Sequence, residues 1–177
     1  MSEEMSVQEL AQKGYDLGVK YEQEYHGCSQ CVLAAIMEIL GEKDPDVFRA
    51  ASGLGAGTGL SGRTTCGALN GGVLAIGQRY GRQLDKFDDK ERARFKAYKL
   101  SRKLLEKFES YYGTNRCGDV QKTMMDCEFD LTDPIQWKHF ESLGGHDTHC
   151  PSVVGNVVKW TIELIKEQEE FEAKANS

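Results

Sequence analysis

Residues 64–80 read TTCGALNGGVLAIGQRY, and this stretch sets the architecture of the chain. Thr64 or Thr65 supplies a side-chain oxygen that caps a helix N-terminus, so we expect a helix over about 66–80. Its many glycines and alanines lower helix propensity, and small residues in a helix favour close packing against neighbours. We therefore expect this helix at the centre of the fold, with a Gly-rich loop directly before it.

Helical signals continue on both sides of this central segment. Ser6 and Glu9 form a capping box, followed by small and apolar residues at helical spacing up to Tyr25. The same kinds of signal predict further helices at 28–40, from Asp44-Pro45, from Asp88-x-x-Glu91 to near Gly113, after Cys117, from Asp133-Pro134 and from Cys150-Pro151.

The helix that ends near Gly113 is amphipathic, and its expected apolar stripe contains Phe95, Tyr98, Leu105, Phe108 and Tyr112. No alternating strand pattern and no β-branched run between turn signals occurs in the chain. We predict an all-α bundle of about six to eight helices.

The size and charge of the chain narrow its function class. Its 177 residues suit one domain, 1–177, with an acidic polar tail from about 166 to 177. The net charge is −6, and no cluster of Lys and Arg is interleaved with aromatic residues. Nucleic-acid binders carry a basic surface, so we do not expect a nucleic-acid partner.

The apolar segments and the N-terminus predict the cellular location of the protein. The first residues, Met1 to Met5, are acidic with no apolar run behind them, so no signal peptide is expected. No apolar stretch approaches the roughly 20 residues that a membrane span needs. We expect a cytoplasmic, bacterial protein, where thiols stay reduced and six cysteines favour metal or catalytic roles.

Four of the six cysteines, Cys28, Cys66, Cys117 and Cys150, fall where helices are expected to start. A helix N-terminus offers free N–H groups and about half a positive charge. It therefore favours the thiolate, which is the form that binds metals or attacks disulfides. Four such positions in one small chain indicate a shared site for metal or redox chemistry.

Two other kinds of cysteine site remain open. Cys28 and Cys31 form a CxxC at a helix start, the spacing of dithiol oxidoreductases, although no βαβ pattern surrounds it and Cys31 suits a buried apolar face. A zinc site needs more ligands than one CxxC, and His146 and His149 would have to supply them, although loop histidines are more often solvated. Cys127 lies between Asp126 and Glu128, which disfavour its thiolate, so we interpret it as a bystander.

The Gly-rich loop contains the string GTGLSG at residues 57–62, formally a GxGxxG. A dinucleotide-binding loop needs a strand before it, whereas a helix is expected here. Glycines also let backbone N–H groups approach a thiolate or an inorganic sulfide closely, and such hydrogen bonds tune a metal cluster. The loop can equally be a connection that needs left-handed backbone.

Together these segments resemble the C-GCAxxG-C-C family of redox-active proteins. The resemblance rests on HGCSQCVL at 26–33, ASGLGAG at 51–57 with TCGALNG at 65–71, the segment from Gly113 to Cys117 with FDLTDP at 129–134, and His149-Cys150-Pro151. It covers about residues 10–165. The family cysteines carried over are Cys28, Cys66, Cys117 and Cys150, while Cys31 and Cys127 lie outside the pattern.

The resemblance implies a redox role with a bound iron–sulfur centre. Our leading hypothesis is an electron-transfer or redox-sensing protein in which the four family cysteines ligate a cluster, most simply [2Fe–2S]. The backbone N–H groups of Gly55, Gly57 and Gly67 would tune its potential. We expect a redox partner protein and allow for a homo-oligomer. The alternatives are thiol–disulfide exchange by Cys28 and Cys31, or a non-catalytic module that binds zinc or another soft metal.

Overall fold

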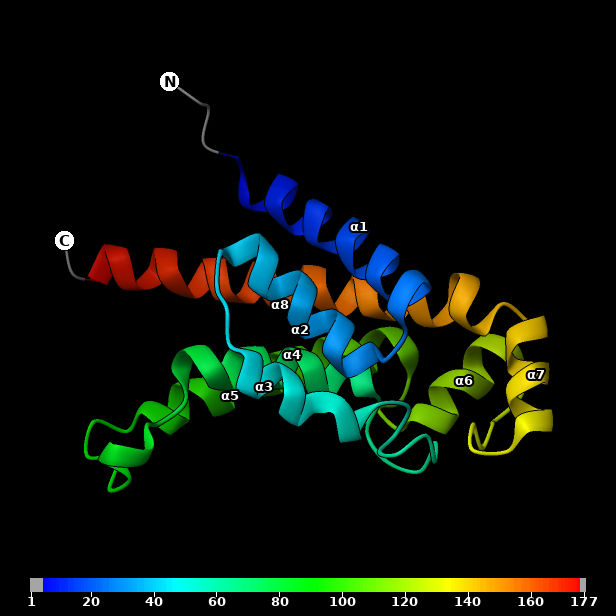
Figure 1. The fold of residues 1–177 in the computed structure, drawn as a ribbon. Coiled ribbons are helices and arrows are strands. Elements are labelled where there is room, and N and C mark those ends of the chain that lie inside the picture. The colour runs from blue at the N-terminus through cyan, green and yellow to red at the C-terminus, as the bar shows by residue number, and fades with distance from the viewer. Residues whose placement is uncertain (1–4, 176–177) are drawn as a thin grey trace.

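The computed structural model describes residues 5–175, and helices make up most of them. The order along the chain is α1 (Val7–Tyr25), α2 (Cys28–Leu40), α3 (Pro45–Ala50), η1 (Ala51–Leu54), α4 (Gly67–Tyr80), η2 (Leu84–Lys86), α5 (Ala93–Tyr112), α6 (Cys117–Met125), α7 (Pro134–Ser142), η3 (Gly145–His149) and α8 (Cys150–Ala175), as drawn in Figure 1. Within the described part of the chain there are eight α-helices and no strand, only an isolated bridge between Thr65 and Arg116. The predicted all-α class is confirmed.

Several helices start and end at the residues that the sequence indicated. The Ser6 hydroxyl accepts from the Glu9 N–H at 3.3 Å, and the Glu9 carboxylate accepts from the Ser6 N–H at 2.9 Å, which completes the capping box of α1. Asp44 and Asp133 cap α3 and α7 ahead of their prolines. Gly41 ends α2 in the left-handed conformation, with φ +69°.

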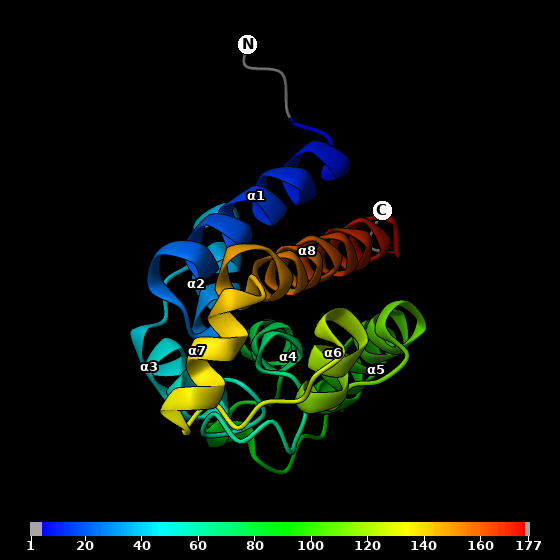
Figure 2. The same ribbon diagram turned by 90° about the vertical axis from the view of Figure 1, so that its right-hand side faces the viewer.

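Helix α4 lies in the middle of the molecule, as its small residues predicted (Figure 2). A Cβ on Gly71 would lie 2.5 Å from the carbonyl oxygen of Ser29 in α2. A Cβ on Gly72 would lie 2.7 Å from side-chain atoms of Leu104 in α5 and Thr161 in α8. Because no side chain fits at either position, these glycines allow three neighbouring helices to pack directly on α4.

Helices α1 and α8 cross in close contact through a second set of small residues (Figure 1). A Cβ on Gly14 would lie 2.4 Å from Cδ1 of Ile162, and one on Gly18 would lie 2.9 Å from Cγ2 of Val158. On the α8 side, Gly155 leaves room for the ring of Tyr15, 2.8 Å from where a Cβ would stand. This packing fixes the C-terminal half of α1 against the first turns of α8.

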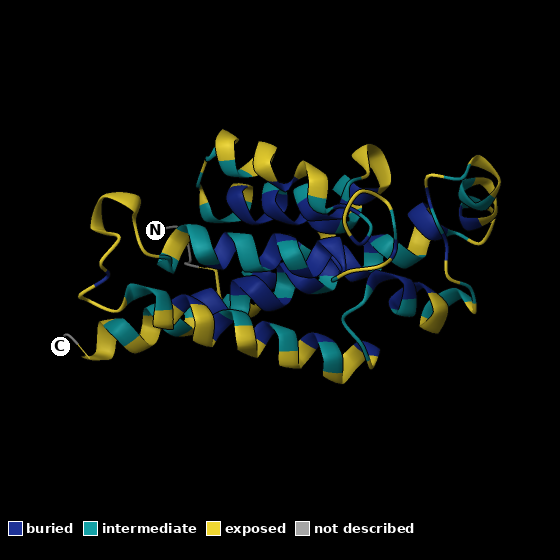
Figure 3. Ribbon diagram, turned by 90° about the horizontal axis from the view of Figure 1, so that it is seen from below, coloured by how far each residue is buried: buried dark blue, intermediate teal, exposed yellow. Residues whose placement is uncertain are grey.

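Helix α5 differs from the prediction in its start and in its buried face. It begins at Ala93 rather than at Asp88, because the buried Asp89 carboxylate accepts from the Ala93 N–H at 2.7 Å. Phe95 and Tyr98 are exposed, and the buried stripe is instead Ala97, Leu100, Leu104, Phe108 and Tyr112. Figure 3 shows the same division, with buried residues facing the central helices and exposed residues on the outer surfaces.

None of the helices within residues 5–175 combines the length and the apolar character that crossing a bilayer requires.

Candidate functional site

The four predicted cysteines line one cavity at one end of the bundle. Cys28 is the first residue of α2, Cys66 is the N-cap of α4, Cys117 begins α6 and Cys150 begins α8. The cavity has a volume of about 140 Å³, whereas about 10–15 Å³ on this measure holds one water molecule. Figure 2 looks onto this end of the molecule, where α6 and α7 lie in front of α4. The rest of the wall is mostly apolar, from Leu60, Met124, Met125, Leu131, Trp137 and Phe140.

Cys66 and Cys117 are held side by side by a short backbone pairing. The Cys66 N–H donates to the Asn115 carbonyl at 2.8 Å, and the Cys117 N–H donates to the Thr64 carbonyl at 2.8 Å. These bonds flank the antiparallel bridge between Thr65 and Arg116. The pairing ties the start of α4 to the start of α6, and the Cys117 thiol hydrogen-bonds to the Cys66 sulfur.

The Gly-rich loop packs against these sulfur-bearing residues. A Cβ on Gly67 would lie 2.4 Å from Sγ of Cys28, and a Cβ on Gly57 would lie 2.8 Å from Cβ of Cys117. Gly57 also needs its left-handed backbone, with φ +71°, and Gly55 lines the cavity. Gly57 and Gly67 thus stand directly at Cys117 and Cys28, where a larger residue would displace the cysteines, whereas an added Cβ on Gly55 would meet only the Ser52 carbonyl oxygen, at 3.9 Å.

The backbone N–H groups that bond to the sulfurs belong to other residues than the expected Gly55, Gly57 and Gly67. Those of Ala56 and Ser29 bond to Cys28, and those of Ala68 and Leu69 bond to Cys66. Such donors stabilise thiolates and metal-bound sulfur.

The four thiols differ in how easily they ionise. The hydrogen bond from Cys117 and the N–H groups of α4 lower the pKa of Cys66. The pKa of Cys117 is raised because its proton is held toward Cys66, and burial raises the pKa values of Cys28 and Cys150. Among the described residues that line the cavity there is no Lys and no Arg. Full ionisation of the four thiols therefore needs positive charge from a bound group.

The helix dipole acts on three of these cysteines rather than on four. Cys28, Cys66 and Cys117 stand at helix N-termini that follow non-helical residues. Before Cys150 the chain already forms the π-helical turn η3, and the Cys150 N–H donates to the Gly145 carbonyl. The expectation of a free helix start at Cys150 is wrong, because η3 and α8 form one continuous helical segment.

The two remaining cysteines lie outside the cavity wall. Cys31 is buried beside it, and its thiol donates to the His26 carbonyl at 3.1 Å. Burial raises the pKa of the Cys31 thiol, with further contributions from Glu22. Cys127 is half-buried and packs on a small cluster formed by Phe129, Leu131 and Phe140, of which Leu131 and Phe140 also line the cavity.

His146 is a cavity residue whose burial the sequence did not predict. The expectation of a solvated histidine is wrong here, since only 8 % of the residue is exposed. Its ring stacks on that of His26 with centroids 4.1 Å apart, and its Nδ1 lies 2.5 Å from a Glu141 carboxylate oxygen. The cause is the turn η3, which places His146 on the inner side of the chain, while His149 is half-buried.

Glu22 is the second cavity residue that sequence reasoning missed. It is 1 % exposed, it lines the same cavity as the four cysteines, and burial raises its pKa to about 8. Among residues 5–175, its Oε2 is the one buried side-chain oxygen or nitrogen without a hydrogen-bond partner. A usable signal was present, because Glu22 continues the buried helical series of Ala11, Gly14 and Gly18.

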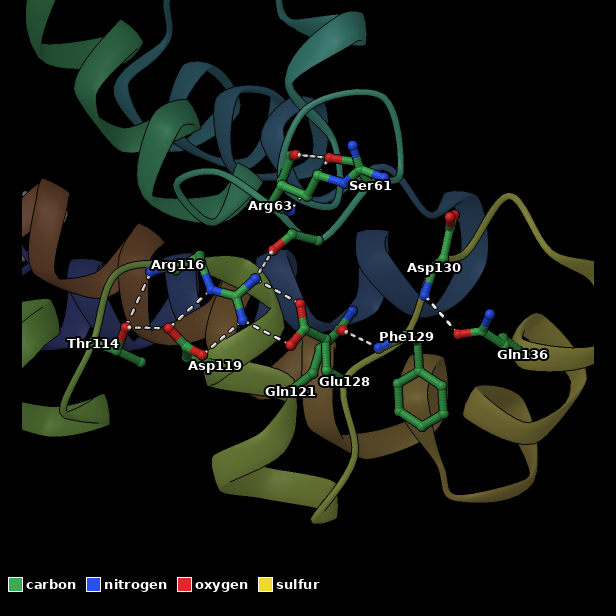
Figure 4. A network of polar contacts seen from close by, with 12 residues as sticks. Ser61, Arg63, Thr114, Arg116, Asp119, Gln121, Glu128, Phe129, Asp130 and Gln136 are labelled. Atoms are coloured by element: carbon green, nitrogen blue, oxygen red, sulfur yellow. Dashed lines mark hydrogen bonds and ion pairs between the residues drawn. The ribbon is translucent and has the colours of Figure 1, made fainter.

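A polar network outside the cavity supports the Cys117 side of the site (Figure 4). The Arg116 guanidinium donates to both carboxylate oxygens of Asp119 and of Glu128, and to the Gly62 carbonyl at 3.3 Å. It lowers the pKa values of both carboxyl groups. Arg116 thereby joins the Gly-rich loop, α6 and the segment after α6 next to Cys117.

The donor set suits a sulfur-ligated metal group, because four thiols and a buried carboxyl group surround one cavity that has no Lys or Arg among its described residues. Within residues 5–175, no three His, Cys, Asp or Glu side chains are arranged to hold a single metal ion. A bridged cluster divides its ligands between metal atoms, so its four thiolates need not surround one point. The residues present therefore fit a cluster in donor type.

Comparisons with known proteins bear on the same residues. Searches of curated proteins and of solved structures found no match. One protein family, described as "Putative redox-active protein (C_GCAxxG_C_C)", matches residues 26–164, which is well over half of the chain and includes all four cavity cysteines. The chain belongs to this C_GCAxxG_C_C family of redox-active proteins.

Proposed function

We propose that the cavity binds an iron–sulfur cluster, most simply [2Fe–2S], through Cys28, Cys66, Cys117 and Cys150, and that the protein transfers electrons or senses redox state through it. The observation that carries this proposal is the shared cavity, since the four thiols come from the starts of four different helices. The family's redox-active description agrees with it.

Charge supports a cationic occupant. The described walls of the cavity carry no Lys or Arg, while four thiols and a carboxyl face it. When bound, an iron–sulfur core supplies positive metal centres and reversible one-electron chemistry. The protein's part is to hold the four sulfurs, to donate N–H groups to Cys28 and Cys66, and to exclude water with an apolar wall.

Dithiol exchange by Cys28 and Cys31 receives less support from the same geometry. Burial raises the pKa values of both thiols, whereas an attacking cysteine needs a lowered pKa and access to its substrate. Cys31 is directed to the His26 carbonyl and lies off the wall that Cys28 shares with Cys66, Cys117 and Cys150.

The proposal includes a redox partner protein and a reducing, cytoplasmic setting. Cluster ligation needs the four cysteines as thiolates, and a reducing compartment keeps cysteines from forming disulfides. The electrons would leave through the end of the bundle where the cavity lies, because this is the part of the protein nearest the cluster.

The test is anaerobic purification of wild type, Cys66→Ser and Cys127→Ser, followed by iron and acid-labile sulfide analysis and a visible absorption spectrum. We expect a brown wild-type protein, loss of iron and sulfide in Cys66→Ser, and an unchanged spectrum in Cys127→Ser. Cys127 is the matched control because it lies outside the cavity wall.

Two results would overturn the proposal. Loss of metal in Cys127→Ser would show that the ligand set is wrong. A colourless wild-type protein that reduces a disulfide substrate, and loses this activity in Cys28→Ser, would assign the site to dithiol exchange.

A further inference from the structure

Glu22 is the most unusual polar residue of the molecule outside the cysteine set. Its side chain is buried, with 1 % of the residue exposed, and it faces the cavity that the cysteines line. One part of the carboxyl group contacts the Cys31 thiol, while Oε2 has no hydrogen-bond partner. Burying an unpaired carboxylate oxygen is costly, so the free Oε2 indicates that a bound group completes its coordination.

The position of Glu22 is fixed by packing and not by its own contacts. Gly18 and Gly14, about one and two helical turns before it, lie directly against Val158 and Ile162 of α8. A Cβ at either glycine would stand within 3.0 Å of these side chains. Helix α1 is therefore held against α8, and Glu22 stays beside the first residue of α8, Cys150, with no room to turn toward solvent.

The described residues of the cavity wall include no Lys or Arg that could pair with an ionised Glu22. Of the two histidines there, His146 pairs with Glu141 and burial lowers the pKa of its ring, while His26 is exposed and its Nδ1 lies 2.9 Å from the Glu22 carbonyl oxygen. With the cavity empty, burial keeps the Glu22 carboxyl protonated at neutral pH, and a bound metal would supply the positive charge that its ionised form needs.

We propose that Glu22 is a fifth protein ligand of the metal group, with Oε2 bonded to an iron atom. Five protein ligands on the two irons of a [2Fe–2S] cluster would place three side chains on one iron, and no three of the described side chains are so arranged, so the group would contain more than two metal atoms. This inference rests on the proposed function and adds a carboxylate oxygen to its thiolate set. A negatively charged oxygen ligand makes the iron atoms unequal and lowers the reduction potential, because net charge and ligand type set the potential of such clusters. Glu22 lies outside the segment that the family matches, residues 26–164, so the four-cysteine motif does not include it.

The test compares full-length wild type with Glu22→Gln and Glu24→Gln, each prepared metal-free under anaerobic conditions. Glu24 lies on the same helix and is exposed, which makes it the matched control. Each protein is loaded with ferrous iron and inorganic sulfide, and four quantities are measured. They are iron per chain, resistance to a chelator, the electron paramagnetic resonance spectrum after reduction, and the thermal unfolding midpoint with and without metal.

We expect Glu22→Gln to hold the cluster at least about tenfold more weakly than wild type, as loss of a metal-site contact does, with a shifted resonance spectrum and a raised reduction potential. Its metal-free form should unfold at the same temperature as wild type or higher, because the variant removes a buried acid that lacks a partner. Glu24→Gln should match wild type in all four measurements.

Equal iron retention and identical resonance spectra in wild type and Glu22→Gln would overturn the assignment of Glu22 while leaving the cysteine ligands in place. A metal-free Glu22→Gln that is less stable than wild type, with an unchanged spectrum when loaded, would likewise reduce Glu22 to a structural residue. Failure of wild type itself to take up iron and sulfide would overturn the proposed function, and this inference with it.

A second variant covers the case in which Glu22→Gln does not fold. Glu22→Asp keeps the charge and shortens the side chain, so a carboxylate ligand predicts a folded protein with weakened retention and an altered resonance spectrum. An unaltered spectrum in Glu22→Asp would overturn the assignment.

Discussion

The centre of the bundle and the cysteine cavity are both enclosed by helices, but they differ in how densely they are packed and in whether their buried polar groups have hydrogen-bond partners. Around Gly72 in the centre, a Cβ would lie 2.7 Å from Leu104 and Thr161, and the Thr161 hydroxyl donates to the Val157 carbonyl at 2.7 Å. The side chains around Gly72 therefore leave no open space, and the buried Thr161 hydroxyl has a hydrogen-bond partner. At the cavity, about 140 Å³ stays open and Glu22 keeps an unpartnered oxygen.

This contrast separates stability from function. Dense packing and paired polar groups stabilise a fold, whereas an open space lined by ionisable groups costs free energy unless something binds there. A natural protein departs from good packing mainly at functional sites. The following changes test whether the two regions are as independent as this division implies.

The largest loss of stability should follow Leu104→Ala in the centre of the bundle. Leu104 is fully buried, and removing a buried leucine side chain costs about 2–5 kcal/mol. Denaturant unfolding of the metal-free protein measures this loss. Iron bound per folded chain should stay at the wild-type value, and a parallel loss of iron would show that the centre and the cavity are one cooperative unit.

The pH dependence of stability should report the buried carboxyl of Glu22. Its pKa rises from 4.5 to about 8 on folding. Between these values the folded protein keeps a proton that the unfolded chain has released, so stability falls as pH rises, by up to about 1.4 kcal/mol per pH unit. Below pH 4.5 both states are protonated and the contribution is fully present, and above pH 8 it is lost.

The pH effect is measured as a difference between two metal-free proteins. Subtracting the profile of Glu22→Gln from that of wild type removes the contributions of the thiols and other shared groups. Parallel profiles between pH 4.5 and 8 would contradict the burial of an unpaired acid at this position.

A smaller loss of stability, with a larger loss of metal, should follow Gly67→Ala at the cavity. The new Cβ would lie 2.4 Å from the Cys28 sulfur and 2.9 Å from the Leu54 carbonyl oxygen. Overpacking of this kind costs about 1–3 kcal/mol, and relief requires that Cys28 move. Denaturant unfolding and iron analysis check both effects.

Gly77→Ala is the control for that change. Gly77 lies in the same helix, and nothing stands within 4 Å of its would-be Cβ. This variant should be neutral or more stable by up to about 1 kcal/mol, since alanine favours a helix over glycine. Equal iron loss in both variants would show that α4 tolerates neither change for reasons unrelated to Cys28.

Much of the helical architecture was predictable, because its signals are local. Ser6 with Glu9, Asp44-Pro45 and Asp133-Pro134 act within one turn of themselves, and each caps the helix that it predicted. The start of α5 was not, because it depends on the buried Asp89 carboxylate, which accepts from the Ala93 N–H, and not on the Asp88-x-x-Glu91 signal. Helix α5 also buries a different set of residues from the predicted one, so that Phe95 and Tyr98 are exposed.

Of the residues that form the site, only the four cysteines could be predicted from the sequence. Cysteine carries its chemistry in any context, so Cys28, Cys66, Cys117 and Cys150 could be selected by residue type and helix position. Glutamate and histidine are ordinary surface residues. The helical series of Ala11, Gly14 and Gly18 distinguishes Glu22 from Glu24, but it indicates burial and not a place at the cysteine cavity. Their roles depend on which residues of other helices face them.

The sequence alone determined the helical class, the central place of the small-residue helix and the identity of the four cysteines, because helix periodicity, caps and thiol chemistry are properties of neighbouring residues. Tertiary structure alone decided that these cysteines share one cavity, that Glu22 and His146 join them, and that no Lys or Arg of the described walls balances their charge. The physical reason is that burial and electrostatic environment arise from contacts between helices far apart in the chain, which no local pattern encodes.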